Sequence, residues 1–289
     1  AVRTPSALFG TLTAFMVFAI GWRWFDRRVA LLGGLLYAIS PWSIHWSQNC
    51  FHPAQTQFFV LLTVYQTHRI LSQEKAKAAD CYLAALFFTL SYLSWEGTGF
   101  VLPILLLVAV FMRWGQWEWL KNKHLWIAAS IVIGVVLLQG VRRVLLQVNY
   151  LMVGSGKSDM SLPQLAFTKT NYSPSFYIDT VFGIESHVVL GGIFVLGLFL
   201  LRRNWNLRFV YLFVLLAIAF MTNFLAYYNA HYIYYVLPMF ILSVAGATVI
   251  GLDGLVRAFR NAEIVESGSR ALRAAIVTIV LGVLSLEFA

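Results

Sequence analysis

Charged residues are scarce in this sequence. Asp, Glu, Lys and Arg together make up 11% of its 289 residues, whereas 60% are hydrophobic and 16% aromatic, and the mean hydropathy is +0.75. A soluble globular domain carries roughly 25% charged residues, because its surface must be hydrated. The scarcity of charge therefore excludes a soluble domain and indicates an integral, multi-pass membrane protein.

Cysteine is also nearly absent. The chain has two, Cys50 and Cys81, and neither has other cysteines or histidines around it at the spacing of a zinc site. The sequence therefore indicates neither a disulfide framework nor a structural zinc.

Apolar runs make up most of the sequence instead. A helix needs about 20 mostly apolar residues to cross a bilayer, and fewer where the membrane thins. By this measure the chain is an all-α transmembrane bundle, a single domain over residues 1–289 with about ten spans. A link of little more than Trp95-Glu96 joins the fourth and fifth spans, which leaves open a re-entrant or broken pair. The predicted spans cover residues 6–22, 29–43, 54–71, 79–94, 97–113, 124–141, 187–201, 208–226, 231–252 and 271–287.

Basic residues gather in alternate loops. These loops carry 16 of the 21 Lys and Arg residues, so the positive-inside rule makes them cytoplasmic. The formal net charge of +9 is thus explained by topology, and no nucleic-acid partner is expected. Both termini then lie outside the cytoplasm, and an N-terminus there without a signal peptide favours a further upstream span, which would make the chain a fragment. We expect a bacterial inner or plasma membrane, or the endoplasmic reticulum in a eukaryote.

Two predicted outer loops carry candidate site residues. Residues 43–53 place Gln48 and His52 among aromatic side chains, a composition suited to a hydroxyl-rich ligand, although an interfacial aromatic belt explains it as well. Glu96 is a lone carboxylate between two apolar spans. It is a candidate general base, metal ligand or acceptor for a sugar hydroxyl, or else it caps the next helix.

Two further outer segments add candidates. Residues 142–186 form the longest hydrophilic loop, and at its start Arg142 and Arg143 bind a lipid phosphate or extend to the headgroup region. The run from Tyr227 to Tyr235 is rich in tyrosine and contains Tyr228 and His231, which are suited to a sugar or phosphate. The alternative is again an aromatic belt.

Three early segments resemble the GT-C glycosyltransferases. These are Val2 to Thr11, Gly21 to Ala30 and Ser40 to Ser47. Within that superfamily they are most similar to the dolichyl-phosphate-mannose protein mannosyltransferase-like branch, which includes bacterial lipid A aminoarabinose transferases. Tyr92 to Pro103 and His231 to Pro238 resemble later segments of the same branch less specifically.

The resemblance implies an inverting membrane glycosyltransferase that uses a polyprenyl-phosphate-linked sugar donor and a lipid, glycan or protein acceptor, among membrane lipids. It also implies a divalent metal, Mg or Mn, and a catalytic acidic residue in an outer loop, here upstream of Ala1. Glu96 is the candidate within the chain. Gln48, His52, Arg142, Arg143, Tyr228 and His231 are the candidates for binding sugar or phosphate.

The sequence departs from that branch at two of these positions. Gln48 and Asn49 stand where relatives carry a charged Arg-Glu pair, and His231 stands where an arginine is common. The loss of charge leaves two other classes of function open. One is a transporter or flippase for a lipid-linked sugar, and the other is a non-catalytic membrane subunit with the same fold.

Overall fold

The computed structural model describes residues 3–49, 52–146, 188–224 and 231–261. Within these ranges the chain is helical and has no strands, as predicted. In order, the helices are α1 (Thr4–Trp24), α2 (Arg27–Ile39), α3 (Pro41–Gln48), α4 (Pro53–Ser72), α5 (Ala78–Ser94), the 3-10 helix η1 (Glu96–Phe100), α6 (Val101–Met112), the 3-10 helix η2 (Trp117–Lys121), α7 (Lys123–Leu146), α9 (Val188–Gly197), the 3-10 helix η4 (Leu198–Arg203), α10 (Trp205–Phe224) and α11 (His231–Asn261).

Helices lie at each of the first nine predicted spans. By length and apolarity, α1, α10 and most of α7 and α11 qualify as membrane spans in the described ranges, and α2 with α3 forms a bent pair that also qualifies. Shorter apolar helices cover Ala78–Ser94, Glu96–Met112 and Val189–Arg202. The predicted span at 271–287 lies outside the described residues, so the number ten stays a prediction.

The second predicted span, 29–43, is wrong in its boundaries. The helix ends at Ile39, and α3 starts at Pro41 at an angle of 56° to α2. Proline cannot donate the next helical hydrogen bond, and it forces the preceding residue out of the helical region. Ser40 accordingly has ψ 127°. Residues 43–48, predicted as a loop, therefore belong to a short helix.

Two other helices are longer than predicted. α7 continues through Leu146, so Arg142 and Arg143 lie in a helix rather than at the start of a loop. The rest of the predicted loop 142–186 lies outside the described residues. α11 runs to Asn261, well beyond the predicted end at 252.

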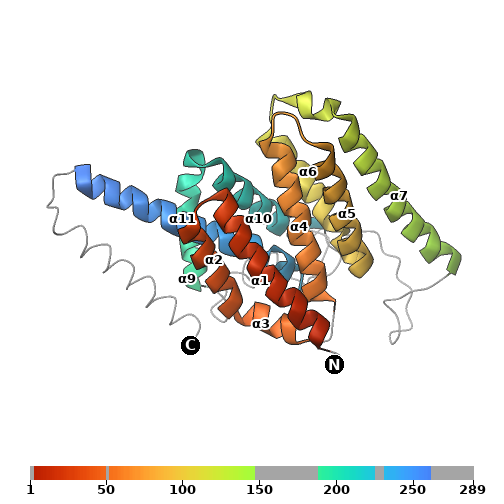
Figure 1. Ribbon diagram of the computed structural model, residues 1–289, viewed down its shortest axis with the longest axis horizontal. Coiled ribbons are helices and arrows are strands. Elements are labelled where there is room, and N and C mark those ends of the chain that lie inside the picture. Colours follow the sequence, from red (N-terminus) through yellow and green to blue (C-terminus); the bar gives the residue numbers. More distant parts are fainter. Residues whose placement is uncertain (1–2, 50–51, 147–187, 225–230, 262–289) are drawn as a thin grey trace.

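The loops rich in basic residues lie at one end of the bundle. Figure 1 places the turns α1–α2, α4–α5, α6–α7 and η4–α10 along its upper side, while α3 and the α5–η1 turn lie below. The chain therefore reverses at the short link after α5, so α5 and α6 are not one broken span, and both are shorter than a full membrane span. We call the upper side the cytoplasmic end, following the positive-inside rule, and the opposite side the outer end.

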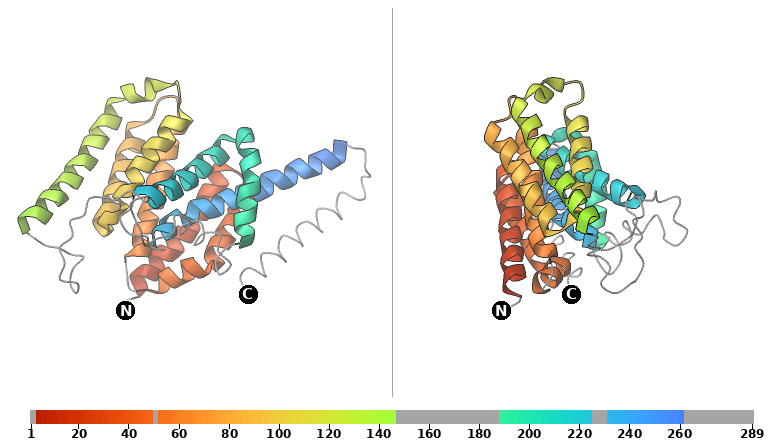
Figure 2. Two further views of the ribbon diagram at one scale, coloured as in Figure 1. Left: turned by 180° about the vertical axis from the view of Figure 1, so that it is seen from behind. Right: turned by 90° about the vertical axis from the view of Figure 1, so that its right-hand side faces the viewer.

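Helix α11 lies at the centre of the bundle. It packs against α10, α9, α2 and α4, and it crosses behind α1 and α2 in Figure 1 and in front of them in the opposite view of Figure 2. All residues from Ile233 to Phe240 are buried, Pro238 included. A helix that is apolar and buried all round belongs to the core of a bundle.

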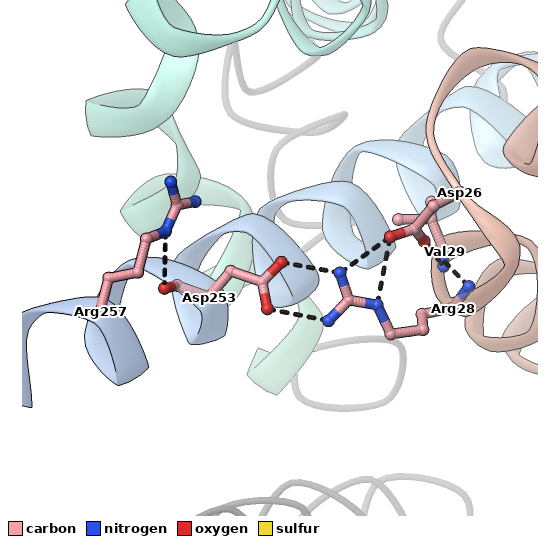
Figure 3. A network of polar contacts seen from close by, with 5 residues as sticks. All are labelled: Asp26, Arg28, Val29, Asp253 and Arg257. Carbon is pink, nitrogen blue, oxygen red and sulfur yellow. Dashed lines mark hydrogen bonds and ion pairs between the residues drawn. The ribbon is translucent and has the colours of Figure 1, made fainter. Parts of the chain in front are cut away.

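The α1–α2 turn is joined to α11 by charged side chains. Asp26 caps α2 by accepting hydrogen bonds from the backbone N–H groups of Arg28 and Val29. The guanidinium of Arg28 then contacts Asp26 at 2.9 Å and Asp253 of α11 at 2.7 Å, as Figure 3 shows. This pairing fixes the position of α11 at the cytoplasmic end.

A second ion pair at the same end joins α4 to α5. Asp80 is 2% exposed and lies 3.1 Å from a guanidinium nitrogen of Arg69. It also accepts a hydrogen bond of 2.9 Å from Gln73. A buried carboxylate requires such partners, because its desolvation is otherwise very costly.

Candidate functional site

The turn after α5 has a geometry that only glycine permits. Trp95 is extended, with φ −162° and ψ 116°, and η1 begins at the next residue. The indole folds back over Gly97, where an added Cβ would lie 2.2 Å from the ring. The absence of a side chain at Gly97 therefore lets Trp95 pack against its own turn.

Aromatic rings from three parts of the chain surround this turn. The Trp95 ring stacks on His52 at a centroid distance of 5.5 Å, and its centroid lies 5.3 Å from that of Tyr232 and 5.4 Å from that of Tyr235. Phe100 packs on the same two tyrosines, at 5.8 and 6.4 Å. We call these five residues the outer aromatic cluster. It joins the starts of α4 and α11 to the end of α5, and aromatic pairs at these distances attract each other beyond their burial.

Glu96 follows directly on the central ring of this cluster. The residue is half-buried, and one of its carboxylate oxygens is shielded from solvent. A carboxylate at the edge of an apolar surface is a strong hydrogen-bond acceptor, because little water competes for it. An acidic residue therefore follows Trp95 in the chain, and an imidazole from the start of α4 stacks on its ring.

A buried amide joins α2, α4 and α11. Gln57 of α4 is fully buried; its amide oxygen accepts a hydrogen bond from the Tyr37 hydroxyl, and its amide nitrogen donates to the backbone carbonyl of Tyr234. That carbonyl lies four residues before Pro238, which has no N–H to donate to it. Gln57 thus supplies the hydrogen bond that proline removes from α11.

Gln57 is not among the site residues predicted from the sequence. The available signal was an amide within an apolar segment, since polar groups inside a membrane are costly and usually paired within the protein. The three helices that Gln57 joins, α2, α4 and α11, come from distant parts of the chain, and no local pattern indicates that they meet.

The predicted site residues fall into three groups. The structure stacks the His52 ring on Trp95, the residue that directly precedes Glu96. Gln48 is exposed at the end of α3, and Arg142 is exposed on α7, a helix that packs against α5. Tyr228 and the side chains of Arg143 and His231 lie outside what the structure describes.

The described residues do not by themselves form a metal site. Nowhere in the described ranges do three or more His, Cys, Asp or Glu side chains come together in a way that could hold a metal ion. Glu96 and His52 would supply two ligands at most.

The arrangement of helices matches solved membrane proteins. ArnT from Cupriavidus metallidurans in the apo state aligns with a TM-score of 0.63 at 17% identity, over 98% of this chain and 56% of that chain. The same protein bound to undecaprenyl phosphate aligns with a TM-score of 0.64 at 16% identity, over 99% and 57%. The chain has the GT-C fold.

A second GT-C protein aligns as well. The archaeal oligosaccharyltransferase AglB from Archaeoglobus fulgidus, in complex with an inhibitory peptide and a dolichol-phosphate, aligns with a TM-score of 0.60 at 16% identity, over 99% of this chain and 44% of that chain. This chain therefore spans a little over half the length of ArnT and less than half that of AglB.

The sequence comparison agrees with the fold. The model of the dolichyl-phosphate-mannose-protein mannosyltransferase family matches residues 1–139, just under half of the chain. No curated protein sequence matches significantly. The matched part contains α1 to α6, including the two candidate residues His52 and Glu96, and it supports the predicted mannosyltransferase-like relationship within the GT-C superfamily.

Proposed function

We propose that this chain is the membrane part of a glycosyltransferase that moves a sugar from a polyprenyl-phosphate-linked donor to an acceptor at the outer face of the membrane. The observation that carries the proposal is that His52 stacks on Trp95 at the outer end of a GT-C fold, directly beside the carboxylate residue Glu96 that follows Trp95 in the sequence. The polyprenyl phosphates bound to ArnT and AglB support a lipid-linked donor.

The proposed reaction is a single displacement. A nucleophilic atom of the acceptor forms a bond to the anomeric carbon of the sugar, and the bond from that carbon to the phosphate oxygen breaks. The polyprenyl phosphate leaves with the electron pair, and attack from the opposite face inverts the anomeric configuration. The acceptor proton passes to a base, for which Glu96 is the candidate in this chain.

The remaining candidates take binding roles in this proposal. His52 and Gln48 hydrogen-bond to sugar hydroxyls, and the outer aromatic cluster provides an apolar surface for the sugar ring. Arg142, Arg143 and His231 contact the phosphate, because positive charge stabilises the negative charge that develops on the leaving group. Tyr228 is proposed to donate a hydrogen bond to the donor.

Sugar transfer by the complete protein tests this proposal. Membranes from cells lacking the gene are complemented with wild-type protein or with Glu96→Gln or His52→Ala, and glycolipids and glycans are profiled. We expect both variants to insert normally and to lose at least about 100-fold in transfer, the effect typical of removing an acid–base group. Glu118→Gln and His124→Ala are matched controls, because both residues lie at the cytoplasmic end.

Two outcomes would contradict the proposal. Full transfer by both Glu96→Gln and His52→Ala would show that these groups do not form the site. If cells lacking the gene kept their glycan profiles but lost lipid-linked sugar from the outer leaflet, the protein would instead be a transporter.

A further inference from the structure

A groove lies along the surface of α1, away from the candidate site. It has a volume of about 520 Å³, and one residue of α4, Tyr65, closes its side. Phe15 and Trp22 in its wall are 64% and 55% exposed. The residues that line it are Phe15, Met16, Phe18, Ala19, Ile20, Trp22, Arg23 and Tyr65.

The groove is apolar along its length and basic at one end. Arg23 belongs to the last turn of α1, beside the cytoplasmic α1–α2 turn. Its side chain is exposed, and it makes no hydrogen bond or ion pair with any residue that the structure describes. Trp22 precedes it. An aromatic ring and an arginine at the end of a span are placed where the hydrocarbon core meets the lipid headgroups.

A second arginine near the groove is already engaged. The Arg69 guanidinium lies 6.0 Å from the Tyr65 ring centroid, but it pairs with the buried Asp80. Arg23 is therefore the cation of the groove that is available to a ligand. Its charge is complementary to a phosphate group, and the apolar wall is complementary to an acyl chain.

We propose that this groove binds an anionic phospholipid of the cytoplasmic leaflet. The acyl chain lies along α1 against Phe15 and Ala19, and the headgroup phosphate accepts hydrogen bonds from Arg23. The site is at the opposite end of the bundle from Glu96, so the proposal does not depend on sugar transfer.

Lipid retention by the complete protein tests the proposal. The protein is placed in nanodiscs of phosphatidylcholine with increasing phosphatidylglycerol, and bound lipids are counted by native mass spectrometry. We expect selective retention of phosphatidylglycerol and an apparent affinity about fivefold lower in Arg23→Gln, which corresponds to about 1 kcal/mol for one arginine near the membrane surface. Arg27→Gln is the matched control, since Arg27 is exposed in the same basic turn but does not line the groove.

A second pair of variants tests the acyl-chain part of the site without changing charge. Ala19→Trp fills the groove and should also lower retention, whereas Leu8→Trp changes an exposed position of α1 outside the groove and should not. Equal losses in Arg23→Gln and Arg27→Gln would overturn the proposal in favour of diffuse attraction to basic residues. Full retention of phosphatidylglycerol by Ala19→Trp would also overturn it. Displacement of the lipid by free glycerol phosphate would do the same, as would the finding that the protein forms a dimer that Arg23→Gln separates.

Discussion

The side-chain amide of Gln57 donates a hydrogen bond to the backbone carbonyl of Tyr234. In an uninterrupted helix that carbonyl would accept from the residue four positions later, which here is Pro238. The interruption in α11 is therefore compensated by α4, a helix far away in the sequence. The amide oxygen of Gln57 also accepts a hydrogen bond from the Tyr37 hydroxyl, so this one side chain is a partner for the Tyr234 carbonyl and the Tyr37 hydroxyl.

Replacement of Gln57 by leucine should destabilise the protein by about 1–3 kcal/mol, because it leaves the buried Tyr234 carbonyl without a partner and removes one partner of the Tyr37 hydroxyl. In a Pro238→Ala background the cost should be smaller, since alanine restores the helical N–H for the Tyr234 carbonyl. Thermal unfolding of the four proteins in detergent forms a double-mutant cycle. Strictly additive effects of the two substitutions would refute the compensation.

Replacement of Gly97 by alanine should displace Trp95 from the outer aromatic cluster. The added Cβ would lie 2.2 Å from the indole, and we expect a loss of about 1–3 kcal/mol in the free energy of unfolding, as for overpacking. Gly134→Ala is the matched control, because no atom lies within 4 Å of a Cβ at that helical position. Differential scanning fluorimetry compares the two, and equal stability would contradict the close packing of Trp95 on Gly97.

Replacement of Asp80 by asparagine should cost about 2–3 kcal/mol. Breaking a buried ion pair typically costs about 3–5 kcal/mol, and the value is smaller here because Arg69 is 29% exposed. The exposed pair of Lys121 and Glu118 is the comparison, with an expected loss of about 0–1 kcal/mol for Glu118→Gln. Urea or thermal unfolding measures both, and similar losses would show that burial of Asp80 contributes little.

Acid should weaken the α1–α2 turn through Asp26. Burial acts to raise the pKa of this carboxyl, but hydrogen bonds from Val29 and Arg28 and the charge of Arg28 outweigh it and lower the pKa below its ordinary value of 3.8. A lowered pKa stabilises the folded state above pH 3.8 and loses this contribution as the pH falls through the lower folded value. The thermal stability of Asp26→Asn, which keeps the helix cap, should therefore depend less on pH between about 5 and 3 than that of the wild type. Identical pH profiles would contradict this role.

The helices, and the end of the bundle at which each loop lies, are predictable from the sequence. The length of an apolar run and the basic residues in a loop are both local features of the chain. The helix break at Pro41 is a local effect too, but the apolar residues on both sides of Ser40 predicted one continuous span. The partner of Gln57 is not predictable, since Tyr234 is 177 residues away. His52 and Glu96 are predictable by residue type, whereas the stacking of His52 on Trp95 depends on how the start of α4 packs against the end of α5.

The two ends of α11 have a fixed rotation relative to each other, because both belong to one helix. Tyr235 in the outer aromatic cluster and Asp253 beside Arg28 lie about 27 Å apart along the helix axis, close to the thickness of a bilayer core. Inserting one residue between them would rotate one end by about 100° relative to the other. The register between the cytoplasmic ion pair and the outer rings is thus set by the number of residues in a single helix.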